Sequence, residues 1–171
     1  MDIEAFIRNV PDFPKPGILF KDITPLLGNG PALSHVVDLF ADRYRGKVDA
    51  VVGVESRGFI FGAPVAYALG VGLCIVRKPG KLPHDKHTVA YELEYGRDTL
   101  EIHKDALPTG SRVVILDDLL ATGGTAKATI ALVEACGAVV VECGFLIELG
   151  FLGGRVALSP KAVHAVLSYN D

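Results

Sequence analysis

Apolar runs and longer amphipathic segments alternate along this chain. Mainly apolar runs, typical of strands buried in a parallel sheet, occur at 48–54, 72–76, 113–116, 138–149 and 163–169. Segments of helical length or spacing precede or separate them at 31–45, 58–70 and 123–136. Strands that alternate with helices predict an α/β fold with a central, mainly parallel sheet flanked by helices.

The first 30 residues follow a different pattern. Ile3, Phe6, Ile7 and Val10 keep the i, i+3, i+4, i+7 spacing, which predicts a short amphipathic helix at the start of the chain. Several prolines end this pattern, and residues 17–22 then predict a short extended piece.

A basic segment punctuated by proline and glycine, residues 77–87, is typical of a mobile loop. After it, residues 88–95 and 99–103 flank the turn-like sequence 96–98 and predict a hairpin. In the first of these strands, acidic residues alternate with apolar ones, and the segment can contribute to a site. An ordinary edge strand with solvated acids would show the same alternation.

Composition and charge narrow the class of protein. A chain of 171 residues, half of them apolar and 22% charged, predicts one folded domain with a sizeable core. Seventeen basic and 20 acidic residues give a net charge of −3, without a basic arm, so we do not expect nucleic acid as a partner. Three cysteines without metal-ligand spacing are expected to be reduced and structural, which suits the cytoplasm.

One segment requires a membrane check. Residues 58–76 carry no charge and are nearly long enough to span a bilayer. However, Pro64 and the sequence Gly70-Val71-Gly72 interrupt the segment, so a helix, a turn and a buried strand explain it more simply. We therefore predict no membrane association.

The most informative stretch of the chain is the run 113–126. Its strand ends in Asp117 and Asp118, and a small-residue turn, Thr122-Gly123-Gly124-Thr125, precedes a helix. Open α/β sheets bind ligands at the carboxyl ends of their strands, and backbone N–H groups at a helix start bind phosphate. Two acids beside a phosphate cradle indicate a phosphorylated sugar. The alternative is a helix cap and a plain turn, but adjacent buried carboxylates repel unless something offsets them.

Other segments can join the same site. Glu55-Ser56-Arg57-Gly58 follows a buried strand, and Arg77, Lys78 and Lys81 follow another, where three cations would suit a pyrophosphate. Each of these segments has an ordinary alternative, since an arginine or a basic loop is often simply solvated. Phe20, in the extended piece at 17–22, can likewise be an ordinary core aromatic.

The run 113–126 resembles the phosphoribosyl-pyrophosphate (PRPP) motif of the type I phosphoribosyltransferases. The segments 11–23, 55–59, 77–83 and 93–96 are similar to those of the adenine-specific branch of that family and occur in the same order. The resemblance implies a type I phosphoribosyltransferase fold over residues 1–171. It comprises a small N-terminal hood (about 1–30) that binds the base and a PRPP-binding core (about 31–171) with a flexible catalytic loop (78–95).

The resemblance also implies a reaction, purine salvage in which PRPP and adenine give AMP and pyrophosphate. Mg²⁺ would be held mainly by PRPP and water, close to Asp117 and Asp118, and the protein would be a cytoplasmic homodimer. Glu94, Arg57 and Lys81 would be catalytic, with Glu94 handling a proton at the purine. The implied substrate-binding residues are Asp117 and Asp118 for the ribose hydroxyls; Ala121, Thr122, Gly123, Gly124 and Thr125 for the 5-phosphate; Ser56, Arg57, Arg77, Lys78 and Lys81 for pyrophosphate; and Ile18, Phe20 and Lys21 for adenine.

Two other functions remain open from the sequence. One is a phosphoribosyltransferase for another base, such as a 6-oxopurine or orotate, because base choice depends on few contacts. The other is a PRPP-binding regulator without turnover, although such a protein would be expected to carry a basic surface or to lack the loop acid.

Overall fold

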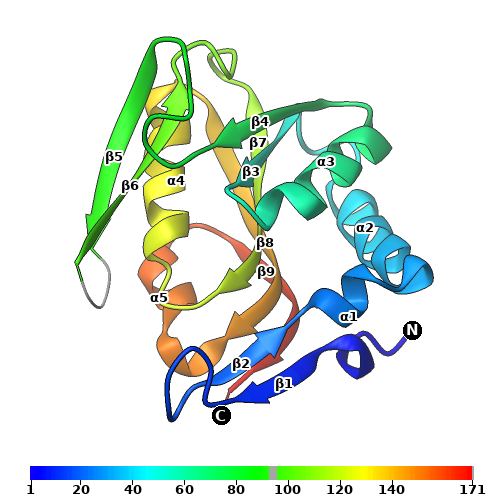
Figure 1. The fold of residues 1–171 in the computed structure, drawn as a ribbon. Coiled ribbons are helices and arrows are strands. Elements are labelled where there is room, and N and C mark those ends of the chain that lie inside the picture. Colours follow the sequence, from blue (N-terminus) through cyan, green and yellow to red (C-terminus); the bar gives the residue numbers. More distant parts are fainter. Residues whose placement is uncertain (93–95, 171) are drawn as a thin grey trace.

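A five-stranded parallel sheet forms the centre of the computed structural model, which describes residues 1–92 and 96–170 (Figure 1). The strand order is β4-β3-β7-β8-β9. Their bounds are β3 Ala50–Val54, β4 Gly72–Val76, β7 Arg112–Leu120, β8 Val139–Leu149 and β9 Val163–Tyr169. Each neighbouring pair is parallel. The predicted mainly parallel α/β sheet is therefore confirmed.

Helices cover both faces of this sheet, because its strands are apolar on both sides. Helices α2 (Gly30–Tyr44) and α3 (Gly58–Leu69) pack on one face against Val51, Val114 and Leu116. Helix α4 (Gly124–Ala135) packs on the other face against Val113 and Ile115. The three predicted helices are confirmed to within about two residues at each end. Two short helices, α1 (Thr24–Leu27) and α5 (Gly154–Leu158), and the 3-10 turn η2 (Gly150–Leu152) were not predicted.

An antiparallel hairpin lies over helix α4, on the face of the sheet opposite α2 and α3 (Figure 1). It consists of β5 (Lys86–Glu92) and β6 (Arg97–His103), and its register places Tyr91 opposite Asp98. Leu100 and Ile102 of β6 are fully buried in the same core as α4. The predicted hairpin is confirmed within the described residues.

The N-terminal segment differs from the helix predicted for it. After the 3-10 turn η1 (Glu4–Phe6), the chain forms β1 (Arg8–Pro11), which pairs with β2 (Leu19–Asp22) in a two-stranded ladder. The prediction of a helix over residues 3–10 was wrong. The helical spacing covers only two turns, and pairing with β2 supplies the backbone hydrogen bonds that so short a helix cannot. The extended piece at 17–22 is confirmed.

Two strands also depart from their predicted form. Strand β4 is an edge strand, with Leu73 and Ile75 exposed rather than buried. Strand β7 continues to Leu120, so Asp117 and Asp118 lie on the strand, as predicted, but two residues before its end. Pairing with β8 keeps this part extended, since Asp117 lies opposite Phe145. The three cysteines are buried and free, as predicted. None of the helices described has the length and apolar character needed to cross a bilayer.

Candidate active site

A cavity of about 390 Å³ lies where β3 and β7 end. The loop after β3, the last residues of β7 and the start of α4 contribute most of its wall. Its lining residues are Glu55, Ser56, Arg57, Lys78, Tyr91, Leu100, Asp117, Asp118, Leu119, Leu120, Ala121, Thr122, Gly123, Gly124, Thr125, Ala126 and Phe145. This is the carboxyl edge of the sheet, where α/β folds bind ligands.

The loop between β7 and α4 has the backbone of an anion site. Gly123 has a φ of 88°, a conformation that glycine adopts without a steric penalty. Helix α4 begins at the next residue, so its first N–H groups have no partner inside the helix and carry the positive end of its dipole. Behind the loop, a Cβ on Gly154 would lie 2.3 Å from the carbonyl oxygen of Ala121. A glycine at 154 therefore lets α5 support the loop closely.

The two adjacent acids differ in their environment. The Asp118 N–H donates to Oδ1 of Asp117 at 2.9 Å, and Arg57 Nε lies 2.5 Å from Oδ2 of Asp118. Burial and the charge of Asp118 raise the pKa of Asp117 well above its ordinary value, although Arg57 opposes the shift. Arg57 therefore compensates part of the repulsion between the two carboxyl groups.

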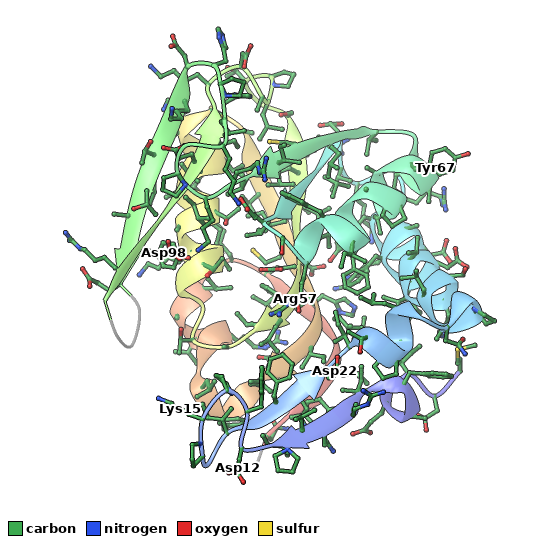
Figure 2. All side chains as sticks on the ribbon, in the orientation of Figure 1. Asp12, Lys15, Asp22, Arg57, Tyr67 and Asp98 are labelled. Atoms are coloured by element: carbon green, nitrogen blue, oxygen red, sulfur yellow. The ribbon has the colours of Figure 1, made fainter. Side chains whose placement is uncertain are left out.

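Arg57 reaches Asp118 because α3 starts close to β7. A Cβ on Gly58 would lie 2.6 Å from the carbonyl oxygen of Leu116 and 3.1 Å from Oδ1 of Asp117. Only glycine permits this approach without a backbone shift. Figure 2 labels Arg57 in the middle of the molecule, between the start of α3 and strand β2.

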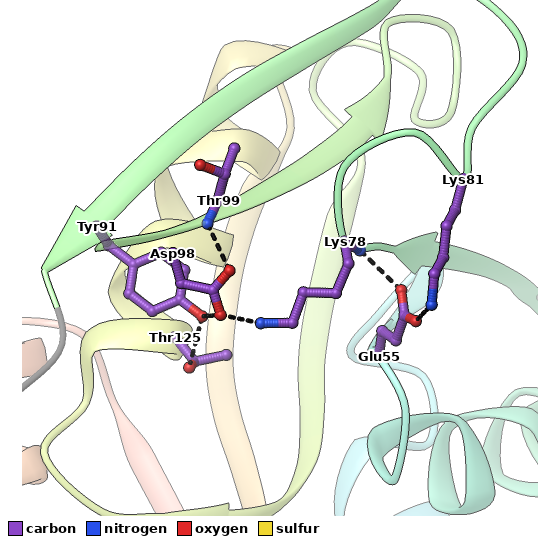
Figure 3. A network of polar contacts seen from close by, with 7 residues as sticks. All are labelled: Glu55, Lys78, Lys81, Tyr91, Asp98, Thr99 and Thr125. Carbon is purple, nitrogen blue, oxygen red and sulfur yellow. Dashed lines mark hydrogen bonds and ion pairs between the residues drawn. The ribbon is translucent and has the colours of Figure 1, made fainter. Parts of the chain in front are cut away.

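Carboxylates of the chain hold the basic residues around the cavity. Glu55 accepts hydrogen bonds from Lys81 Nζ, from the Lys78 N–H at 2.7 Å and from Arg77 Nε at 3.3 Å. Burial raises the pKa of Glu55, but these hydrogen bonds, that of Lys81 above all, lower it to about 2. The Lys78 ammonium instead contacts Asp98 of β6 (Figure 3).

A second, mostly apolar cavity of about 120 Å³ adjoins the first. Three residues line both cavities: Arg57, Asp118 and Leu119. The rest of its wall comes from β2, the residues that flank it and the end of β8, namely Ile18, Leu19, Phe20, Lys21, Ile23, Ile147 and Leu149. Phe20 is half-buried and packs edge-to-face on Phe13, with ring centroids 5.0 Å apart.

The Lys21 side chain contacts two residues that do not line this second cavity. Its Nζ donates to Oδ1 of Asn9 at 2.8 Å and lies 3.7 Å from the centre of the Tyr169 ring. The backbone of Lys21 is therefore the part of this residue that remains for a ligand.

The structure brings most of the predicted site residues together. Ser56, Arg57, Lys78, Asp117, Asp118 and residues 121–125 line the larger cavity. Ile18, Phe20 and Lys21 line the smaller one. Arg77 and Lys81 do not line either cavity, and both are bound to Glu55. Glu94 lies outside the described residues.

Two residues of the site, Asp98 and Gly154, were not predicted to take part in it, and Glu55 and Tyr91 were predicted only as members of candidate segments, without roles of their own. Glu55 binds three groups of the basic segment, Tyr91 and Asp98 connect the hairpin to the cavity, and Gly154 supports the phosphate loop. The alternation in β5 indicates which residues face inward, and so could have indicated Tyr91. Nothing local in the sequence marks the contact of Asp98 with Lys78 or that of Gly154 with Ala121, because these partners are distant in the chain.

The carboxylates of the site do not form a metal cage of their own. Across residues 1–92 and 96–170, no group of three or more His, Cys, Asp or Glu side chains is arranged to hold a metal ion. One or two carboxylates beside a phosphate site nevertheless suit Mg²⁺, which keeps several waters and binds substrate phosphates. Asp117 and Asp118 provide that donor set.

A parallel sheet with an anion loop and two acids at its carboxyl edge is the arrangement of a nucleotide- or sugar-phosphate-binding enzyme. The family model described as phosphoribosyl transferase domain matches residues 26–154. The chain belongs to the phosphoribosyltransferase family.

Relatives over the full chain place it within that family. It is 58% identical to the adenine phosphoribosyltransferase of Roseiflexus sp. (strain RS-1), over 98% of both chains. The adenine phosphoribosyltransferase structure from Thermoanaerobacter pseudethanolicus has a TM-score of 0.94 and 51% identity, covering 98% of each chain. That from Saccharomyces cerevisiae, complexed with D-2,5-dideoxy-2,5-imino-altritol 1,6-bisphosphate and adenine, has a TM-score of 0.93 and 43% identity, over 97% of both chains. Its branch of the family is therefore that of the adenine phosphoribosyltransferases.

Proposed function

We propose that the chain transfers the 5-phosphoribosyl group of PRPP to adenine, giving AMP and pyrophosphate in purine salvage. The observation that carries this proposal is the pair of adjoining cavities, one polar with an anion loop and one apolar, that share Arg57 and Asp118. The relatives named above are adenine phosphoribosyltransferases, and the yeast structure holds adenine together with a bisphosphate.

The larger cavity supplies the groups that the sugar phosphate needs. The Asp118 carboxylate is proposed to accept a hydrogen bond from one ribose hydroxyl, and Asp117 beside it from the neighbouring hydroxyl. The backbone N–H groups and hydroxyls of Ala121, Thr122, Gly123, Gly124 and Thr125 surround the 5-phosphate at the start of α4.

The departing pyrophosphate requires positive charge. Ser56, Arg57, Arg77, Lys78 and Lys81 are proposed to bind it. Arg77 and Lys81 are paired with Glu55, and Lys78 with Asp98, so pyrophosphate must share these cations with the carboxylates or displace them. As the bond to pyrophosphate breaks, C1 of the ribose becomes oxocarbenium-like. Arg57 and Lys81 stabilise the charge that develops on the leaving group.

The smaller cavity suits a purine ring. Its wall is largely apolar, and Phe20 offers an aromatic surface whose position Phe13 supports. The backbone near Ile18 and Lys21 reads the edge of adenine, as the resemblance implies. That both cavities share Arg57 and Asp118 supports a purine site next to the proposed ribose end of the larger cavity.

Glu94 is proposed to handle a proton at the N7/N9 edge of adenine. As the resemblance implies, the segment 78–95, which includes strand β5, is proposed to close over the site and exclude water, because water would hydrolyse PRPP. Changing Glu94 to Ala should then lower turnover and leave PRPP affinity nearly unchanged. Unaltered turnover would remove Glu94 from the mechanism.

Mg²⁺ is proposed as the cofactor, held mainly through PRPP oxygens and water close to Asp117 and Asp118. When bound, it neutralises charge on the pyrophosphate group. The protein is further proposed to act as a cytoplasmic homodimer without nucleic-acid partners. The division into a hood (1–30) and a PRPP-binding core (31–171) stays a prediction.

The experiment that tests the function is a panel of bases. The protein is incubated with PRPP, Mg²⁺ and, in separate reactions, adenine, hypoxanthine, guanine and orotate, and products are separated by chromatography. The proposal expects AMP from adenine and little product from the other bases. Product only from another base would assign a different phosphoribosyltransferase activity. Binding of PRPP without product from any base would indicate a regulator.

A further inference from the structure

Asp98 of β6 connects two parts of the site that come from different elements (Figure 3). Its Oδ2 contacts the Lys78 ammonium and accepts a hydrogen bond from the Tyr91 hydroxyl at 3.2 Å. The Thr125 hydroxyl in turn donates to the Tyr91 hydroxyl at 3.3 Å. One carboxylate thus joins the basic segment to the first turn of α4.

The position of Asp98 relative to the cavity determines what it can do. Lys78, Tyr91 and Thr125 line the larger cavity, whereas Asp98 is not one of its described lining residues. It therefore holds cavity-wall side chains from behind and does not compete for the ligand itself. The Thr99 N–H donates to its Oδ1 at 2.8 Å, and antiparallel pairing places it opposite Tyr91, so the backbone fixes its own position.

Packing against α4 makes this connection stiff. A Cβ on Gly124 would lie 3.3 Å from Cδ2 of Tyr91, so the ring lies directly against the first turn of the helix. Hydrogen bonding from Lys78 lowers the pKa of Asp98, which keeps the carboxylate ionised at neutral pH. The negative charge is therefore present when the site meets its substrate.

We propose that Asp98 is a positioning residue of the PRPP site, holding the Lys78 ammonium at the pyrophosphate end and, through Tyr91, orienting the Thr125 hydroxyl at the 5-phosphate end. This proposal rests on the proposed function, since it assigns the two ends of the larger cavity to the two phosphate groups of PRPP. Asp98 touches neither group and acts only through Lys78 and Tyr91.

The ligands used for the test are magnesium pyrophosphate and ribose 5-phosphate, each titrated alone into the full chain by calorimetry. Asp98→Asn keeps an acceptor for the Thr99 N–H but removes the charge. It should weaken pyrophosphate binding by about fivefold, the upper range for a partly exposed ion pair. In a Lys78→Met background, the same change should have almost no further effect, because two residues that act as a unit are not additive.

The second test variant, Tyr91→Phe, and the control, Glu92→Gln, both lie in strand β5 of the hairpin. Tyr91→Phe removes only the hydroxyl and should weaken ribose 5-phosphate binding by about threefold, as for one hydrogen bond. Glu92→Gln removes a carboxylate from the adjacent exposed pair with Arg97 and should change neither affinity. Thermal unfolding of each variant shows that it is folded. If Asp98→Asn does not fold, Tyr91→Phe still tests the arm that leads to Thr125.

Two results would overturn the proposal. One is unchanged pyrophosphate affinity in Asp98→Asn, and the other is an equal loss with and without Lys78, which would indicate a purely structural role. Either result with AMP formation intact in the wild type would leave the proposed function standing. Conversely, the expected affinities in a wild type that makes no AMP would support the positioning role and contradict the proposed function.

Discussion

Arg57 Nε lies 2.5 Å from Oδ2 of Asp118, and both residues line both cavities of the site. The Asp118 side chain is only 9% exposed, whereas Arg57 is about half exposed. The arginine can therefore turn toward a ligand in either cavity while the carboxylate stays in place. This ion pair is the structural boundary between the larger cavity, proposed for the sugar phosphate, and the smaller one, proposed for the base.

Removing the charge of Asp118 should weaken PRPP binding. Asp118→Asn is expected to lower the affinity by at least about tenfold, because hydrogen bonds to a charged acceptor contribute more than neutral ones. Calorimetric titration with PRPP and Mg²⁺ measures this. Asp49→Asn is the matched control, since Asp49 pairs with Arg112 at the opposite end of β7. Equal affinities for the two variants would contradict the ribose assignment.

The ionised Asp117 side chain should destabilise the folded protein at neutral pH. Its folded pKa is raised, so its ionisation opposes folding once the pH rises above the unfolded value of about 3.9. Asp117→Asn keeps the acceptor for the Asp118 N–H but cannot ionise. Its melting temperature should exceed that of the wild type by a few degrees at pH 8, and the difference should shrink toward pH 4. Circular dichroism measures this, and a variant less stable at every pH would be the contrary result.

Glu55 should show the opposite pH dependence. Its folded pKa of about 2 lies below the unfolded value of about 4.3, so its contribution to stability is present above pH 4.3. That contribution disappears as the pH falls toward 2. Glu55→Gln is therefore expected to be less stable than the wild type at pH 7 and nearly equal to it near pH 2. Glu92→Gln, on an exposed pair, should match the wild type throughout.

A methyl group at Gly154 should disturb the phosphate loop. Its Cβ would lie 2.3 Å from the Ala121 carbonyl oxygen and 2.8 Å from Leu120. Gly154→Ala is expected to destabilise the fold by about 1–3 kcal/mol, as overpacking does, and to weaken ribose 5-phosphate binding. Gly72→Ala meets nothing within 4 Å and serves as the control. Denaturant unfolding and calorimetry test both effects, and a Gly154→Ala variant indistinguishable from the control would refute the supporting role of α5.

The sequence predicts those parts of the fold that depend on local pattern. The buried strands and the helices at 30–44, 58–69 and 124–135 follow from apolar runs and helical spacing. The residues 3–10 were predicted incorrectly, because their pairing with β2 is a tertiary contact that outweighs a two-turn helical pattern. Likewise, β7 stays extended past Leu116 because Asp117, Leu119 and Leu120 pair with strand β8, which is distant in the chain.

The same distinction holds for the site. Asp118 and the loop at 121–125 carry their chemistry in adjacent residues, so the run itself indicates a phosphorylated ligand. The carboxylate partners of the cations, by contrast, are not indicated by any such run. Glu55 and Lys81, or Lys78 and Asp98, are brought together by loops and by the hairpin, and local sequence carries no signal for either pair.

The strand order has a consequence for how the protein is made. Ala50 of β3 pairs with Val113 of β7, and β4 and the whole β5–β6 hairpin lie between them in the chain. Pairing between strands so distant in sequence is slow, because loop-closure entropy opposes it until the contacts form. Arg57, just after β3, can therefore meet Asp118 only when synthesis has passed β7. A nascent chain that has released β3, β4 and the hairpin from the ribosome still lacks the binding site, and acquires it when the central strand pairs with β3.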